Sequence, residues 1–120
     1  MKKKEVYVGI MSWEDYQQYT LDIVAGKRKP IKNAPQIWFN SLQTMAHVLS
    51  EKNQVLLEVI EREHPSSIRE LSQAIGRKEG NLSRSLKTLE KYGVVELIRG
   101  KKAVRPVVKA NSFVVQFGVQ

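Results

Sequence analysis

The sequence predicts an α+β protein built as one domain with an appended N-terminal region. The chain has 120 residues, of which 42% are hydrophobic and 27% charged, a balance typical of a single folded domain. Apolar alternation predicts short strands near both ends of the chain, and apolar residues at helical spacing dominate the middle. We therefore divide the chain into an N-terminal extension over residues 1–50, a helix-rich domain over residues 51–109 and a C-terminal strand over residues 110–120.

Net charge is the least ordinary property of the composition. Twenty Lys and Arg residues against twelve Asp and Glu residues leave +8. Residues 77–109 hold ten basic and three acidic residues and carry +7, whereas residues 1–76 hold ten basic and nine acidic residues and carry +1. A charge concentrated in this way indicates a polyanionic partner.

Several classes of function are disfavoured by what the sequence lacks. Without cysteine it has no disulfides, catalytic thiols or cysteine-rich zinc sites. Neither His47 nor His64 has a second ligand at suitable spacing, and no catalytic triad or glycine-rich phosphate loop is present, so we expect no metal, no cofactor and no enzyme activity. The apolar stretches are too short for a membrane span, and the lysines at positions 2–4 lead into no signal-peptide core. We therefore expect a cytoplasmic protein that has no membrane partner.

The first fifty residues are predicted to form a strand, a helix and a second strand, followed by a short helix. Alternating apolar residues over 5–10 indicate the first strand. Ser12 begins the helix with a capping-box pattern that Asp15 completes, and Gly26 ends it. The segments that follow are a basic, proline-containing loop over residues 27–35, a strand over residues 36–39, and a helix capped by Asn40 or Ser41 and running to residue 49.

Aromatic side chains are frequent in this extension. Trp13 and Tyr16 lie with Val24 on one side of the first helix, and Trp38 and Phe39 end the second strand. Aromatic residues at such spacing are more often core or dimer contacts than the lining of an effector pocket. We expect the core or dimer role.

A longer helix and a short one open the next region. Ser50 caps the longer helix over residues 51–63, which Pro65 cannot continue. Ser67 begins the short helix with a second capping box, and Gly76 ends it after less than three turns. Another helix is expected within a few residues.

That second short helix is predicted by a leucine pattern. Leu82, Leu86 and Leu89 recur at spacings of four and three, and Gly93 supplies a glycine stop. At about 100° per residue these leucines form one seam, and the opposite side carries polar and basic residues: Arg84, Lys87 and Lys91, flanked by Asn81 and Thr88. The two short helices are therefore a helix-turn-helix candidate.

A hairpin with a basic tip is predicted after Gly93. Residues 94–98 and 103–108 have strand patterns on either side of a tight turn over residues 99–102, in which we expect Gly100 to adopt a positive φ. Pro106 has no N–H to donate, so the returning strand should be paired on one side only.

The order of helix, turn, helix and hairpin resembles the winged helix-turn-helix of MarR-like prokaryotic transcription factors. The resemblance covers residues 51–109 and is carried by Ser67 to Leu71, by Ala74 to Gly76 and by the run from Leu82 that ends in LEKYGVV. The segment GRKEGNLSRSLKTLEKYGVVEL, with the entry from Ile37 to Ser41, is similar to a family of small predicted prokaryotic DNA-binding regulators, some of which look like antitoxins encoded beside a small toxin. The implied fold is a winged helix-turn-helix at residues 51–109 with an N-terminal strand-helix-strand extension.

Double-stranded DNA is the partner that this fold implies. A major groove about 12 Å wide admits a helix, and a basic hairpin tip suits a minor groove or a phosphate ridge. The predicted DNA-binding residues are Ser67, Arg69, Arg77, Lys78, Asn81, Arg84, Ser85, Lys87, Thr88, Lys91, Arg99, Lys101, Lys102 and Arg105.

We expect a transcriptional regulator that acts as a repressor and as a homodimer. One recognition helix contacts too few base pairs for genomic specificity, so two copies on a palindromic operator, with half-sites about one helical turn apart, are required. Candidates for the dimer contact are the N-terminal strand and helix, the strand at 36–39, and the alternating Phe113, Val115 and Phe117.

Two alternatives remain open. In the first, the chain is the antitoxin of a toxin-antitoxin pair, which binds a small toxin through residues 1–50 and represses the shared operon through its basic half. The nearly neutral, aromatic N-terminal region favours this hypothesis. In the second, the same winged fold binds RNA.

Overall fold

The computed structural model of the chain describes residues 2–30 and 34–117. Within these residues there are five helices and five strands, so the predicted α+β class is confirmed. In chain order the elements are β1 (Glu5–Ile10), α1 (Trp13–Val24), β2 (Ile37–Phe39), α2 (Leu42–Val48), α3 (Glu51–Glu63), α4 (Ile68–Ile75), α5 (Glu79–Lys91), β3 (Val95–Arg99), β4 (Val104–Val108) and β5 (Ser112–Gln116). Each predicted strand and helix is present, although part of the predicted loop, residues 31–33, lies outside the described residues. No helix in the described ranges is both long and apolar enough to span a membrane.

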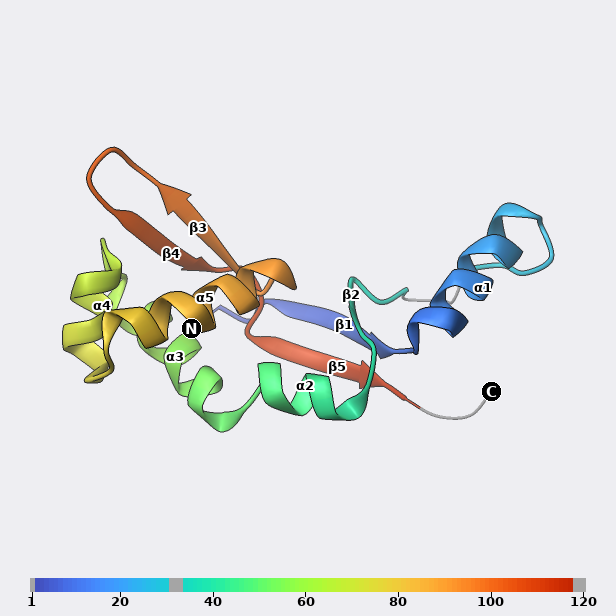
Figure 1. Cartoon of the computed structure of the whole chain (residues 1–120), viewed down its shortest axis with the longest axis horizontal. Helices are drawn as coiled ribbons and strands as arrows, with labels where there is room; N and C mark the ends of the chain where they lie inside the picture. The colour runs from blue at the N-terminus through green and yellow to red at the C-terminus, as the bar shows by residue number, and fades with distance from the viewer. Residues whose placement is uncertain (1, 31–33, 118–120) are drawn as a thin grey trace.

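A three-stranded parallel sheet joins the two ends of the chain. β1 is the central strand, with β2 on one side and β5 on the other (Figure 1). Val8 is in register with both Ile37 and Val115, so apolar side chains of all three strands lie on one face. Because both sides of β1 are paired within the chain, this strand offers no free edge to a second copy.

Serine caps begin four of the helices, as predicted. Each accepts a hydrogen bond from the backbone N–H three residues later; these residues are Ser12, Ser41, Ser50 and Ser67. Ser41, and not Asn40, is therefore the cap of α2. The second capping box differs from its expected form, because the Glu70 carboxylate accepts from the backbone N–H of Ser66, at 3.3 Å.

Glycines with left-handed backbone end the predicted helices. Gly26, Gly76 and Gly93 have φ between 75° and 79°, which a residue with a Cβ rarely adopts. Gly100 has no positive φ, so that prediction is wrong. The four-residue loop after Arg99 closes instead through a hydrogen bond from the Gly100 N–H to the Ala103 carbonyl oxygen, at 2.9 Å.

One hydrophobic core spans the sheet and the helices. The leucine seam of α5 (Leu82, Leu86 and Leu89) is fully buried, as are Leu71 in α4 and Val8 in β1. All five belong to a single cluster of contacting side chains. The strands of the extension therefore complete the core of the helical region.

A polar cluster ties the chain ends to α3. The Lys4 Nζ lies 3.3 Å from the Glu61 Oε1 and donates to the carbonyl oxygen of Val108 at 2.8 Å. Asn111 accepts from the backbone N–H of Lys4 at 2.7 Å and donates through its Nδ2 to Glu61 at 3.0 Å. These bonds fix the start of β1 and the start of β5 on the same helix.

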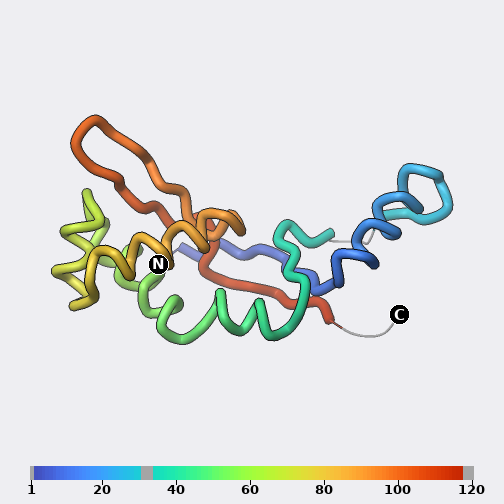
Figure 2. The backbone as a smooth tube through the Cα atoms, viewed as in Figure 1, coloured from blue at the N-terminus to red at the C-terminus, as the bar shows by residue number. Residues whose placement is uncertain are grey.

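α1 projects from the rest of the molecule. Figures 1 and 2 show it extending beyond the end of the sheet, at the opposite end from α4. Tyr19 is the only buried residue of this helix, and the rings of Tyr16 and Tyr19 lie 5.6 Å and 6.0 Å from the Trp38 ring. Trp13 and Val24 are exposed, so the core side of α1 is the side that carries the two tyrosines.

Candidate nucleic-acid interface

α4, α5 and the β3–β4 hairpin lie side by side (Figure 1). The left-handed Gly76 ends α4, and α5 begins three residues later, so the turn between them is short. β3 and β4 pair antiparallel, with Leu97 opposite Pro106. Within the described residues β4 pairs only with β3, as the proline predicts.

The outward side of α5 carries the basic residues predicted for it. Arg84, Lys87 and Lys91 are exposed, on the side opposite the buried leucine seam. The Arg84 Nη2 donates to the Asn81 Oδ1 at 2.8 Å, and the Thr88 Oγ1 donates to the Arg84 carbonyl oxygen at 3.1 Å. The guanidinium and the amide are thus held together on one exposed surface.

The first turn of α5 has no side-chain cap. Lys78 occupies the N-cap position with an extended backbone and makes no capping hydrogen bond through its side chain. The backbone N–H groups of this turn therefore have no acceptor from the side chain of the cap residue. The exposed ammonium group of Lys78 belongs to the same end of the helix. A helix terminus of this kind favours an anion.

Arg77 and Ser85 are placed differently from the exposed cations. The Arg77 side chain is half-buried, and its Nη2 donates to the Ser85 Oγ at 3.0 Å. Its Nε and Nη1 are buried without a hydrogen-bond partner. The Ser72 Oγ donates to the Arg77 carbonyl oxygen. In this conformation Arg77 and Ser85 join the turn to α5 and do not extend outward.

The tip of the hairpin is basic and unpaired. Lys101, Lys102 and Arg105 are exposed, and none has an ion pair among the described residues. At the base of the tip, Arg99 forms a two-point ion pair with Glu90 of α5, with distances of 3.0 Å and 3.3 Å. This pairing lowers the pKa of Glu90 and raises the pKa of Arg99. Arg99 therefore links the hairpin to α5.

The two residues predicted in α4 have separate roles. The Ser67 Oγ caps the helix by accepting from the Glu70 N–H at 3.0 Å. Arg69, in the first turn of α4, is exposed. Hydrogen bonds from Ser66 lower the pKa of Glu70, which stays ionised in the same turn.

Sequence reasoning missed Glu90 as part of this surface. Its position, nine residues before Arg99 and on the other side of the left-handed Gly93, is the signal that was available. A chain that reverses at a glycine after a helix brings the last helical turn beside the strand that follows. An acidic residue in that turn is then a natural partner for an arginine in the strand.

Together these elements define an α+β protein whose helix pair and hairpin present basic side chains around one fully buried leucine seam. Residues 48–115 match the model of the HVO_A0114 family, and because the match covers more than half of the chain, the protein belongs to that family. No curated protein and no solved structure matches the chain.

Proposed function

We propose that the chain is a sequence-specific DNA-binding transcriptional regulator in which α4, α5 and the β3–β4 hairpin act as a winged helix-turn-helix. One observation carries the proposal: α5 buries a leucine seam and exposes cations on its opposite side, next to a hairpin whose tip also carries exposed cations without ion pairs. Any amphipathic surface helix separates its sides in this way, but a solvated face does not require a neighbouring hairpin whose tip carries the same charge.

In the proposed complex α5 lies in the major groove. Arg84 and Asn81 have the donor and acceptor groups that distinguish guanine and adenine edges, and their mutual hydrogen bond orients them before DNA arrives. Lys87 and Lys91 neutralise phosphates on either side. The uncapped first turn of α5, with Lys78, holds a further phosphate.

The hairpin supplies contacts outside the major groove. Lys101 and Lys102 lie at its tip and suit a phosphate ridge or a minor groove. The ion pair between Arg99 and Glu90 keeps the tip at a fixed angle to α5, so the two contacts act together. Arg99 in this scheme positions the hairpin and does not itself bind DNA.

Two copies on an inverted repeat complete the proposal, since one α5 contacts too few base pairs to select an operator in a genome. Occupation of such a site beside a promoter would repress transcription. The full chain, mixed with sheared genomic DNA at moderate salt, should retain fragments that share an inverted repeat when these are sequenced. Fragments recovered without any shared motif, or binding that single-stranded RNA removes and duplex DNA does not, would contradict the proposal.

A further inference from the structure

The α1 arm carries an apolar stripe that no part of the described chain covers. We define the α1 arm as α1 together with residues 25–30. Trp13, Leu21 and Val24 are 63%, 61% and 81% exposed. At about 100° per residue they fall within about 80° of one another on α1. A single exposed apolar residue is ordinary, but three on one side of a projecting helix mark a contact surface.

The shape of the molecule shows that the α1 arm extends away from the rest of the chain. The radius of gyration is 16.5 Å and the principal extents are 51 × 29 × 27 Å, whereas a compact chain of this length has a radius of gyration of about 14 Å. α1 has 12 residues. A helix this short is marginally stable in water without packing along its length. Tyr16 and Tyr19 pack on Trp38, but the side of the helix with the stripe is exposed, so this side of the arm needs a surface to pack on.

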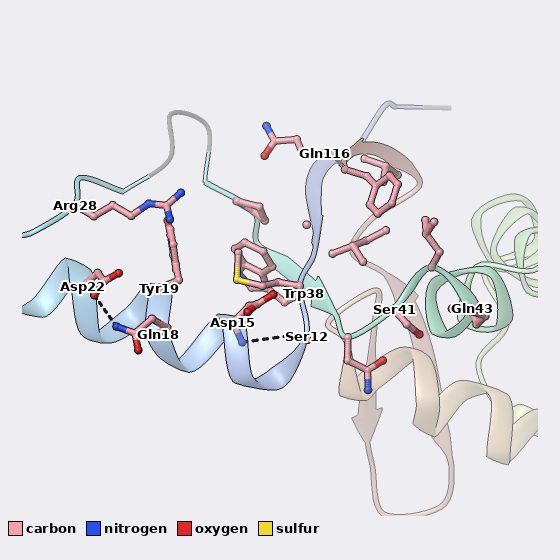
Figure 3. A pocket seen from close by; sticks show the side chains of 18 residues that line it. Ser12, Asp15, Gln18, Tyr19, Asp22, Arg28, Trp38, Ser41, Gln43 and Gln116 are labelled. Atoms are coloured by element: carbon pink, nitrogen blue, oxygen red, sulfur yellow. Dashed lines mark hydrogen bonds between the residues drawn. The ribbon is translucent and has the colours of Figure 1, made fainter. Parts of the chain in front are cut away.

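A hollow lies at the base of the arm. It has a volume of about 1010 Å³ and opens where β1, β2 and β5 end (Figure 3). One wall is formed by α1, including Asp15, and the other wall includes three apolar residues, Leu42, Val115 and Phe117. Phe117 is 65% exposed. An apolar stripe and an apolar wall of similar size thus stand uncovered on the same chain.

Charge along the arm selects the orientation of a partner arm. α1 carries three acidic residues and no basic one, and the residues after it include Lys27 and Lys29, both exposed. Two such arms laid antiparallel place the basic end of each beside the acidic start of the other, whereas a parallel arrangement opposes like charges. A two-fold axis perpendicular to the two arms produces the antiparallel arrangement.

We propose that two copies of this chain exchange their α1 arms, so that the stripe of each arm covers the Leu42, Val115 and Phe117 wall of the other copy's hollow. The six apolar side chains of each copy contribute roughly 600 Å² of apolar surface, and the polar margin brings the contact towards the ~800 Å² per partner of a stable interface. Because each copy supplies both the stripe and the wall, the contact closes after two copies. The inference rests on the proposed function, which requires a two-fold dimer, and gives that dimer its contact surface.

Charge placed on the stripe tests the exchange. The Leu21→Glu/Val24→Glu variant alters only exposed positions, so its helix content by circular dichroism should match the wild type. In sedimentation velocity of the full chain, the apparent mass of this variant should be half that of the wild type. Phe117→Glu, in the wall, should have the same effect. The control Val55→Glu/Gln73→Glu, at exposed positions on α3 and α4, should sediment as the wild type does.

A monomeric wild type, including one that pairs only with a different small protein, overturns the exchange, and so does a Leu21→Glu/Val24→Glu variant that stays dimeric. DNA binding is measured on the same samples so that the two proposals fail separately. A wild-type dimer that binds no DNA overturns the proposed function and leaves the exchange standing. A wild type that is monomeric in solution and assembles as two copies only on an inverted repeat overturns the exchange and leaves the proposed function standing.

Discussion

Removal of the two lysines at the tip of the β3–β4 hairpin should flatten the salt dependence of DNA affinity. Lys101 and Lys102 are exposed and have no ion pair in the described chain, so their charges are available for phosphates. The lysines assigned to phosphates, Lys78, Lys87, Lys91, Lys101 and Lys102, give about ten contacts per dimer, which predicts a slope of log affinity against log salt near −9, at about 0.9 per contact. The Lys101→Ala/Lys102→Ala variant removes four lysines from a dimer, which should bring the slope to about −5.

Fluorescence anisotropy of a labelled operator duplex, measured over a series of salt concentrations, gives these slopes directly. The control is Lys2→Ala/Lys52→Ala, which removes the same charge from two exposed positions outside the hairpin and α5. Its slope should stay near that of the wild type. Equal slopes for the hairpin variant and the control would refute phosphate contact by the tip, and a wild-type slope near zero would refute the electrostatic argument as a whole.

Four further predictions concern α5 and its supports. Arg84→Ala should weaken operator binding by about 1 to 3 kcal/mol and relax the base preference. Fluorescence anisotropy with operator duplexes that differ at single bases measures both effects. An unchanged base preference would place the base contacts on other residues. Leu86→Ala empties a fully buried site and should lower the free energy of unfolding in urea by about 2 to 5 kcal/mol, whereas a loss under 1 kcal/mol would mean that the seam repacks. Because the pKa of Glu90 is lowered, the stabilisation from its ion pair with Arg99 is fully present above pH 4.5, the usual pKa of the carboxyl, and is lost as the pH falls through the lowered pKa. Glu90→Gln should abolish this pH dependence in the hydrogen exchange of the β3 amides. A pH dependence that persists in this variant would assign it to another group. Asn111→Ala removes three side-chain hydrogen bonds, to Lys2, Lys4 and Glu61, and should cost about 1 to 3 kcal/mol of unfolding free energy; no loss is expected only if water replaces all three.

Local features of this fold were predictable because their causes lie within a few residues. A serine before a helix accepts a hydrogen bond from an N–H three positions later, and a glycine after a helix readily adopts a positive φ. The buried seam of α5 follows from the spacing of Leu82, Leu86 and Leu89, since helical geometry alone puts them on one side. The same spacing placed Arg84, Lys87 and Lys91 on the exposed side before any tertiary contact was known.

Long-range features were not predictable in this way. The parallel pairing of β1 with β5 joins segments from opposite ends of the chain, and alternation in each strand says nothing about its neighbour. The side of α1 that packs on the rest of the chain was not predictable, because Tyr16 and Tyr19 pack on Trp38, a residue from a strand that the helical spacing does not locate. Arg99 was grouped with the other cations of the hairpin because its partner Glu90 belongs to α5.

Ion pairs within residues 77–109 confine the net positive charge to fewer side chains than the sequence alone indicates. Residues 77–109 contain three acidic side chains, and two of them, Glu90 and Glu96, lie beside Arg99 and Lys109. Each of these pairs is neutral, so the whole excess of that segment falls on the other basic residues, which gather on α5 and at the hairpin tip. A protein that needed only solubility would gain from acidic residues spread among these cations. Two of the three acidic residues are in neutral pairs and the third, Glu79, lies in the first turn of α5, so the cations of α5 and of the hairpin tip repel one another, and a bound polyanion relieves this repulsion.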